Sequence, residues 1–206
     1  MSERGRVGIL ISGRGSNMVA LVDAMRRAEI PAEPVLVLSN SPTAAGLEAA
    51  AERGVPTLVV DSKQIKPRSV HEDAVIDALR EQRVDLVCLA GYMRLLTAKM
   101  VTAFPQAIMN IHPSLLPSFP GLHAQRQALE HGAKVAGCTV HYVDEECDHG
   151  PIILQAPVPV REGDTEDSLS ARILELEHQV YPKAVSLYFE RRLRVEGRNV
   201  RILPEA

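Results

Sequence analysis

Short apolar runs alternate with helix-like segments along the first half of the chain. A strand buried on both faces of a parallel sheet reads as a continuous apolar run, whereas an amphipathic helix repeats its apolar residues every three or four positions. The alternation of the two patterns predicts an α/β fold, a doubly wound, mainly parallel sheet with helices on both faces. The predicted strands cover residues 7–11, 35–38, 57–60, 86–90 and 107–111, and the predicted helices cover 18–25, 44–53 and 70–82.

The pattern changes after residue 111. Three prolines interrupt the next segment, which we expect to be a loop. A short helix is predicted over 125–131, and longer strand patterns over 134–143 and 152–160 predict a mixed edge to the sheet.

Apolar residues then recur at steps of three and four, which predicts a long amphipathic helix over 166–191. Asp164 and Thr165 precede it and suit a helix cap. The alternating tail over 193–203 predicts a small hairpin around Glu196 and Gly197. The expected inner face of the helix comprises Leu169, Ile173, Leu176, Val180, Ala184 and Leu187.

The chain has 206 residues, and we expect one domain over 1–206, with a phosphate-binding half over 1–104 and a catalytic half over 105–206. A hydrophobic content of 46% suits a globular protein, and the net charge of -3 gives no reason to expect a nucleic acid or a membrane as partner. The amino terminus shows no secretory signal, and no apolar run is long enough to span a membrane. Three scattered cysteines predict neither a disulfide framework nor a zinc site, so we expect a cytosolic protein.

The first candidate site is the glycine loop between the first strand and the first helix. Gly13, Gly15, Ser16 and Asn17 stand where backbone amides at a helix start can hold an anion. Met18 replaces the third glycine of the dinucleotide fingerprint, so we expect a single phosphate rather than a dinucleotide. A tight turn without a ligand remains the alternative.

The second candidate site is the end of the fifth predicted strand. Asn110 and His112 stand two positions apart, which places both on one side of a strand with α-carbons roughly 6.6 Å apart. An amide donor beside a proton-transfer group is suited to form a tetrahedral oxyanion and to move the proton of an attacking amine. Both residues could instead be hydrogen-bonding groups of a loop.

Asp148 lies in the acidic stretch 144–150, which we expect to form an exposed loop. Its carboxylate could orient His112, or a water beside it, and favour the protonated ring. A solvated turn acid is the alternative. No metal site is expected, because the positions of His112, His123, Asp148 and His149 match no familiar ligand spacing.

Five stretches in this order resemble the glycinamide ribonucleotide formyltransferases of purine synthesis, which use 10-formyltetrahydrofolate. The resemblance covers most of the chain and implies a formyltransferase-type, Rossmann-like fold. It also implies transfer of the formyl group to the amine of glycinamide ribonucleotide, giving N-formylglycinamide ribonucleotide and tetrahydrofolate. We expect a monomer or a homodimer. The stretches are SGRGSN at 12–17, AGYMRLL at 90–96, NIHPSLLP at 110–117, PGLH at 120–123 and DHGPIILQ at 148–155.

The same resemblance implies a role for each matching residue. Asn110, His112 and Asp148 would be catalytic, and Asn110 would also contact the folate. The nucleotide phosphate would lie on Gly15, Ser16 and Asn17, and the ribose would contact Glu177. The folate would contact Arg68, Met93, Arg94, Leu95 and Leu96.

Three alternatives remain. A relative could pass the formyl group to water or to an aminoacylated transfer RNA, although those relatives carry an additional domain for which we expect no room here. A phosphate-binding module without catalysis is the third. Within the transferase interpretation, His149 could compete with His112 for the carboxylate of Asp148.

Overall fold

The computed structural model describes residues 4–205. The chain divides into two compact units, residues 1–109 and 110–206, and each is described by itself. Within the described part of the chain, no helix is both long and apolar enough to cross a membrane.

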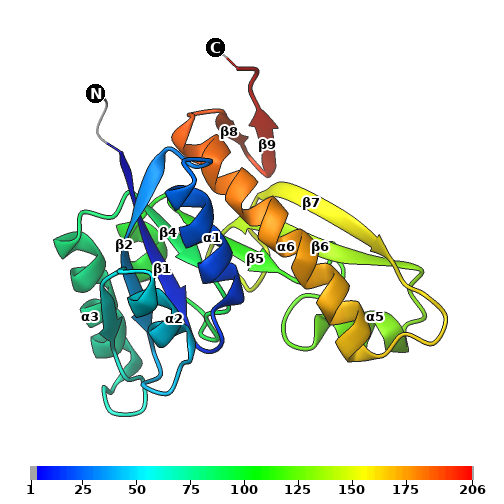
Figure 1. Ribbon diagram of the computed structural model, residues 1–206, viewed down its shortest axis with the longest axis horizontal. Helices are drawn as coiled ribbons and strands as arrows, with labels where there is room; N and C mark the ends of the chain where they lie inside the picture. The colour runs from blue at the N-terminus through cyan, green and yellow to red at the C-terminus, as the bar shows by residue number, and fades with distance from the viewer. Residues whose placement is uncertain (1–3, 206) are drawn as a thin grey trace. The chain divides into compact units, whose positions relative to one another are not determined.

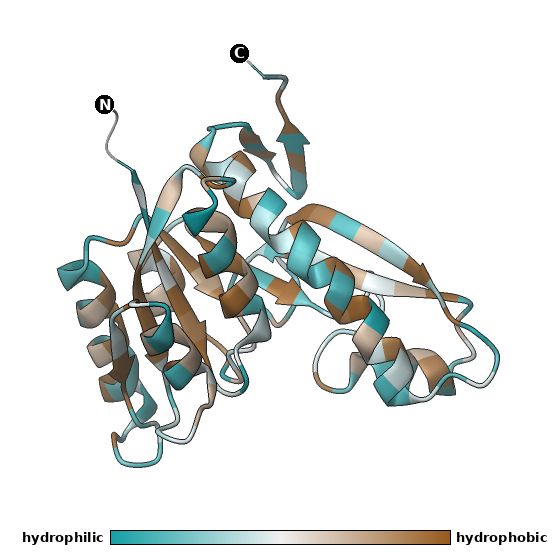
Figure 2. Ribbon diagram, viewed as in Figure 1, coloured by the Kyte–Doolittle hydropathy of each residue, from teal (hydrophilic) through white to brown (hydrophobic). Residues whose placement is uncertain are grey.

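The first unit contains a parallel sheet with the strand order β3-β2-β1-β4 (Figure 1). Its strands are β1 (Gly5–Ile11), β2 (Ala32–Ser39), β3 (Thr57–Val59) and β4 (Leu86–Leu89), and each adjacent pair runs parallel. The apolar runs of the sequence thus form the predicted strands. β1, β2 and β4 are mostly brown in Figure 2, as expected for strands that lie in the core. The edge strand β3 is exposed throughout.

Helices lie on both faces of this sheet. They are α1 (Ser16–Arg26), α2 (Gly46–Glu52), α3 (Arg68–Glu81) and α4 (Ala98–Ala103). A methyl group at Gly8 would lie 2.6 Å from Leu79 of α3, whereas Ile11 lies against Gly46 of α2. Side chains three positions apart on a strand point to opposite faces, so α2 and α3 cover opposite sides of β1. The predicted doubly wound arrangement is confirmed.

The second unit contains a mixed sheet with the strand order β5-β6-β7-β9-β8. Its strands are β5 (Ile108–His112), which crosses the boundary between the units, β6 (Val135–Tyr142), β7 (Ile152–Pro159), β8 (Leu193–Glu196) and β9 (Asn199–Ile202). The pairs β6–β7 and β8–β9 are antiparallel, and β7–β9 is parallel. The predicted mixed edge and terminal hairpin are therefore confirmed.

Two helices belong to the second unit, α5 (Ala124–Glu130) and α6 (Glu166–Phe189), and α6 packs on β6 and β7 (Figure 1). The predicted cap is present. The Ser168 amide donates to Thr165 Oγ1 at 3.2 Å, and the Thr165 amide donates to Ser168 Oγ at 3.0 Å. This reciprocal pair satisfies two amides that the first helical turn leaves free.

The buried face of α6 differs in part from the prediction. Leu176 and Val180 are only half-buried, and Glu177 and Tyr181 are buried in their place. Steps of four from Leu169 keep residues on one helical face, and these steps reach 173, 177 and 181. The prediction followed apolar residues alone and could not place a buried acid on this face.

Other differences are small. The predicted and observed ends of most helices and strands differ by one to three residues. Helix ends in particular depend on capping, which the apolar pattern does not show. Helix α4 was not predicted, because six residues are too few to show a helical period.

We predict that Gly8→Ala destabilises the protein by about 1–3 kcal/mol, because the added methyl group meets the Leu79 and Val84 side chains at 3.2 Å or closer. Chemical denaturation measures this difference. Gly13→Ala is the matched control, since a methyl group there meets no atom within 4 Å. Equal stability of the two variants would contradict this account of the packing between β1 and α3.

Candidate active site

Asn110 and His112 both lie on β5, at the end that enters the second unit. The His112 ring is buried, and its Nε2 lies 2.9 Å from the backbone oxygen of Phe119. A carbonyl oxygen can only accept a hydrogen bond, so Nε2 must carry a hydrogen. The other ring nitrogen, Nδ1, therefore has a lone pair in the neutral ring.

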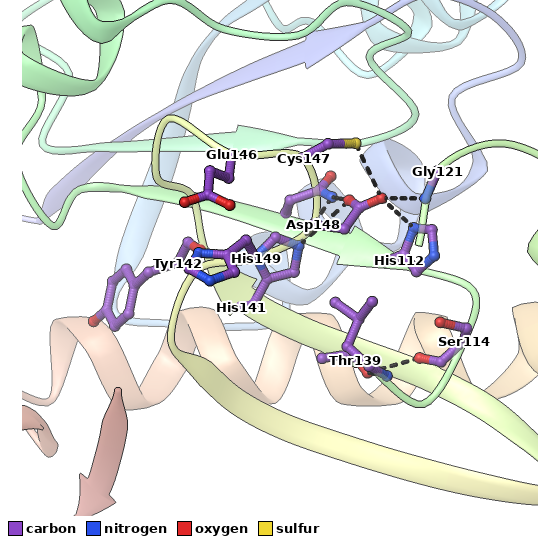
Figure 3. A network of polar contacts seen from close by, with 12 residues as sticks. His112, Ser114, Gly121, Thr139, His141, Tyr142, Glu146, Cys147, Asp148 and His149 are labelled. Carbon is purple, nitrogen blue, oxygen red and sulfur yellow. Dashed lines mark hydrogen bonds and ion pairs between the residues drawn. The ribbon is translucent and has the colours of Figure 1, made fainter. Parts of the chain in front are cut away.

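Asp148 lies beside both residues, and its contact with His112 can be followed in Figure 3. Its Oδ2 is 3.3 Å from His112 Nδ1 and accepts a hydrogen bond of 2.8 Å from the Gly121 amide. Its Oδ1 accepts a longer one, 3.4 Å, from Asn110 Nδ2. The structure thus brings the three predicted catalytic residues into one cluster.

The alternative of a solvated turn acid does not hold for Asp148, whose side chain is only 11% exposed. The surrounding loop is exposed at Glu145 and Glu146, but the backbone of Asp148 turns inward with a φ of 51°. This left-handed conformation is uncommon outside glycine, although aspartate tolerates it better than most residues. The turn composition of the sequence could not reveal this inward turn.

The contact between His112 and Asp148 requires a proton. With Nε2 hydrogen-bonded to Phe119, the neutral ring would direct the Nδ1 lone pair at a carboxylate. Two acceptors at this distance repel each other, and a proton on Nδ1 converts the contact into a charge-assisted hydrogen bond. The geometry therefore suits a pair that holds one proton and can deliver it.

A buried hydroxyl supports the loop that follows β5. Thr139 Oγ1 donates to the Ser114 backbone oxygen at 2.7 Å and accepts from the Leu116 amide at 3.0 Å. Gln155 Nε2 donates to the same hydroxyl at 2.9 Å. Every hydrogen-bonding position of this hydroxyl is in use, which fixes the loop that carries Phe119 and Gly121.

His141, on β6, is a site residue that the sequence analysis missed. Its Nε2 lies 3.2 Å from Asn110 Nδ2 and 3.8 Å from Asp148 Oδ1. Burial lowers the pKa of His141, and this effect exceeds the opposing hydrogen bond to Tyr142 and the charge of Asp148. A histidine at an interior position of an otherwise apolar strand pattern was the available signal.

His149, which could have competed for the Asp148 carboxylate, contacts Asp144 instead. His149 Nδ1 lies 2.8 Å from Asp144 Oδ2, and Arg198 donates to the His149 backbone oxygen at 2.6 Å. The second histidine near Asp148 is His141 instead.

The glycine loop lies in the first unit. Gly15 has a φ of 74° and directly precedes α1, which begins without a side-chain cap. The Gly13 oxygen accepts a hydrogen bond of 3.0 Å from the Gly46 amide, which holds the loop against α2. A methyl group on Gly15 would lie 3.0 Å from the Gly46 α-carbon, so this position requires glycine for space as well as for conformation.

Most of the predicted folate-binding residues surround one pocket of the first unit. Arg68, at the start of α3, donates to the Leu95 backbone oxygen. Glu72, one turn later, accepts from the Thr97 amide at 2.9 Å, which ties the segment after β4 to α3. Met93 does not line the pocket and is 67% exposed. The lining comprises Arg68, His71, Glu72, Val75, Tyr92, Arg94, Leu95, Leu96 and Met100.

Glu177 lies on the buried face of α6 in the second unit. Its charge affects Cys138 of β6, where burial first and Glu177 second raise the pKa of the thiol to about 12. A buried acid on the sheet side of a helix is an unusual packing residue. No group of three or more His, Cys, Asp or Glu among residues 4–205 could hold a metal ion.

Comparison with known proteins shows the family of the chain. The formyl transferase family profile matches residues 5–185. The chain belongs to the formyl transferase family. The phosphoribosylglycinamide formyltransferase of Escherichia coli is 42% identical over 91% of this chain and 88% of its own length. The "glycinamide ribonucleotide transformylase 1" of Symbiobacterium toebii is 54% identical, with a TM-score of 0.97 over 99% of this chain and 96% of that one.

A longer relative also matches this formyl transferase. The trifunctional purine biosynthetic protein adenosine-3 of Drosophila melanogaster is 50% identical over 89% of the chain. The chain spans only 14% of that protein's length. The shared region is therefore one part of a larger protein in that relative.

Proposed function

We propose that this formyl transferase moves the formyl group of 10-formyltetrahydrofolate to the amine of glycinamide ribonucleotide. The observation that carries the proposal is the cluster of Asn110, His112 and Asp148, in which a carboxylate oxygen lies 3.3 Å from an imidazole nitrogen and beside an amide donor. The names of the Escherichia coli relative and of the solved structure support the same acceptor. The products are N-formylglycinamide ribonucleotide and tetrahydrofolate.

The amine attacks the formyl carbon, and the carbonyl oxygen becomes an oxyanion. The amide hydrogens of Asn110 and the protonated ring of His112 stabilise that charge. The tetrahedral intermediate then collapses, the bond from carbon to N10 of the folate breaks, and the electron pair goes to N10. The attacking nitrogen loses one proton and N10 gains one. His112, with Asp148 holding its protonated form, is the group that transfers this proton.

The remaining assignments are part of the proposal. The amides of Gly15, Ser16 and Asn17 hold the acceptor phosphate, supported by the uncapped start of α1. Glu177 contacts the ribose. The folate contacts Asn110 and the segment 93–96, and Arg68 meets its acidic tail. The single-domain organisation over 1–206, the monomeric or homodimeric state and the cytosolic location stay predictions.

One assay tests the proposal against its alternatives. The protein is mixed with 10-formyltetrahydrofolate, with and without glycinamide ribonucleotide, and release of tetrahydrofolate is followed. We expect release only when the acceptor is present. Release without acceptor would favour hydrolysis, and no release under either condition would favour a binding module.

We predict that Asp148→Asn lowers kcat by roughly two to four orders of magnitude, the range for lost acid–base assistance, and leaves ligand Kd values within about tenfold. The variant keeps an acceptor for the Gly121 amide and removes the charge that holds the proton. Steady-state kinetics and direct binding separate the two effects.

Asp144→Asn is the matched control, because Asp144 lies in the same loop and pairs with His149 rather than His112. We expect its kcat to remain within about threefold of the unchanged protein, as for most surface substitutions. A similar loss in both variants would mean that the loop, rather than the Asp148 charge, matters.

We predict that Gly15→Val raises KM for the ribonucleotide at least about tenfold more than KM for the folate, because the side chain displaces the amides that hold the phosphate. Gly54→Val is the control. Gly54 has a similar φ of 59° but lies after α2, and a methyl group there meets no atom closer than 3.9 Å. Equal changes in both KM values would refute the phosphate assignment.

A further inference from the structure

The Asn110 side chain has contacts that determine which way its amide points. Its Nδ2 position lies 3.2 Å from His141 Nε2 and 3.4 Å from Asp148 Oδ1. An ionised carboxylate only accepts hydrogen bonds, so the atom facing it must be the NH2 group. The amide oxygen therefore points away from both partners.

The state of the His141 ring follows from its other contact. His141 Nδ1 lies 2.7 Å from the backbone oxygen of Tyr142, which can only accept, so Nδ1 carries the hydrogen. The ring is only 2% exposed, and burial lowers its pKa, so it is neutral near pH 7. In this neutral tautomer Nε2 has a lone pair and accepts a hydrogen bond from Asn110.

We propose that His141 is a positioning residue, whose Nε2 lone pair holds one hydrogen of the Asn110 amide and directs the other at the reacting oxygen. The inference rests on the formyl transfer proposed above. The amide has two hydrogens, and the one directed at Asp148 makes the longer, weaker contact. An incoming oxyanion can share that hydrogen with Asp148, while the bond to His141 keeps the amide from flipping.

The arrangement has a clear benefit for catalysis. An amide that is free to flip presents its oxygen to the developing oxyanion for part of the time. The partial negative charge of that oxygen then repels the oxyanion. A donor that is already oriented needs no reorganisation when the charge forms, which is why fixed donors contribute most to stabilising a transition state. The ground-state substrates gain little from it, so kcat should change more than KM.

The first test measures the ring directly and does not require turnover. Long-range ¹H–¹⁵N NMR of the uniformly labelled protein reports which nitrogen of His141 is protonated. We expect a neutral ring with hydrogen on Nδ1 at pH 7. A hydrogen on Nε2, or a doubly protonated ring at that pH, would overturn the proposal even if the enzyme is fully active.

The second test is a double-mutant cycle on the full-length protein. His141→Phe keeps a planar ring and removes the acceptor. We expect it to lower kcat roughly 10–100-fold and to change neither KM by more than about threefold. In an Asn110→Ala background the same change should lower kcat by less than about threefold, because His141 then has no amide to position. Equal losses in both backgrounds would show that His141 does not act through Asn110.

A conservative variant separates positioning from packing. His141→Gln supplies a carbonyl oxygen as acceptor, and we expect its kcat to be at least about fivefold higher than that of His141→Phe. Thermal unfolding of all variants is measured in parallel. The proposal is overturned if kcat falls with Tm, whether or not the side chain at position 141 can accept a hydrogen bond. If the protein without substitutions shows no turnover that depends on glycinamide ribonucleotide, the proposed function is refuted. The NMR result would still decide the protonation state of the His141 ring.

Discussion

The structure of the candidate site depends on the contact between His112 Nδ1 and Asp148 Oδ2, which lie 3.3 Å apart. The opposite ring nitrogen already donates to the Phe119 backbone oxygen, so the contact attracts only when Nδ1 is protonated or the carboxyl group carries the proton. Both side chains are nearly buried, and charges in such surroundings interact more strongly than in water. The surrounding structure therefore has to hold two loops, the loop after β5 and the loop that carries Asp148, so that this contact forms.

Three features of the second unit meet that requirement. β5 ends at His112 and presents it beside Asn110, and the loop that follows is fixed through Ser114 and Leu116 by the Thr139 hydroxyl. Phe119 adopts a φ of 54° and Asp148 one of 51°, both in the left-handed region. Such conformations raise the energy of a non-glycine residue and persist only where surrounding contacts determine them. Here those contacts include the hydrogen bonds that fix His112 and the Gly121 amide.

Much of this organisation could be predicted from the sequence, because its causes are local. Apolar runs predicted β1, β2 and β4, since a strand covered on both faces has little room for polar residues. Two-residue spacing predicted that Asn110 and His112 share a side of β5. The inward turn of Asp148, the burial of Glu177 and the part played by His141 could not be predicted in this way. Each involves a partner that is distant in sequence. Asp148 contacts Gly121, Glu177 lies near Cys138 of β6, and His141 contacts the Asn110 amide.

Two histidines contact one carboxylate, and their environments give them different states. His141 is buried within β6, its Nδ1 donates to the Tyr142 backbone oxygen, and burial lowers its pKa. A positive charge on His112 lowers that pKa further, so a second proton in the cluster is opposed by desolvation and by repulsion together. His141 is therefore the neutral histidine of the cluster. The neutral His141 serves as an acceptor for the Asn110 amide. One carboxylate thus contacts both an imidazole and an amide donor, the two kinds of group that the proposed formyl transfer requires.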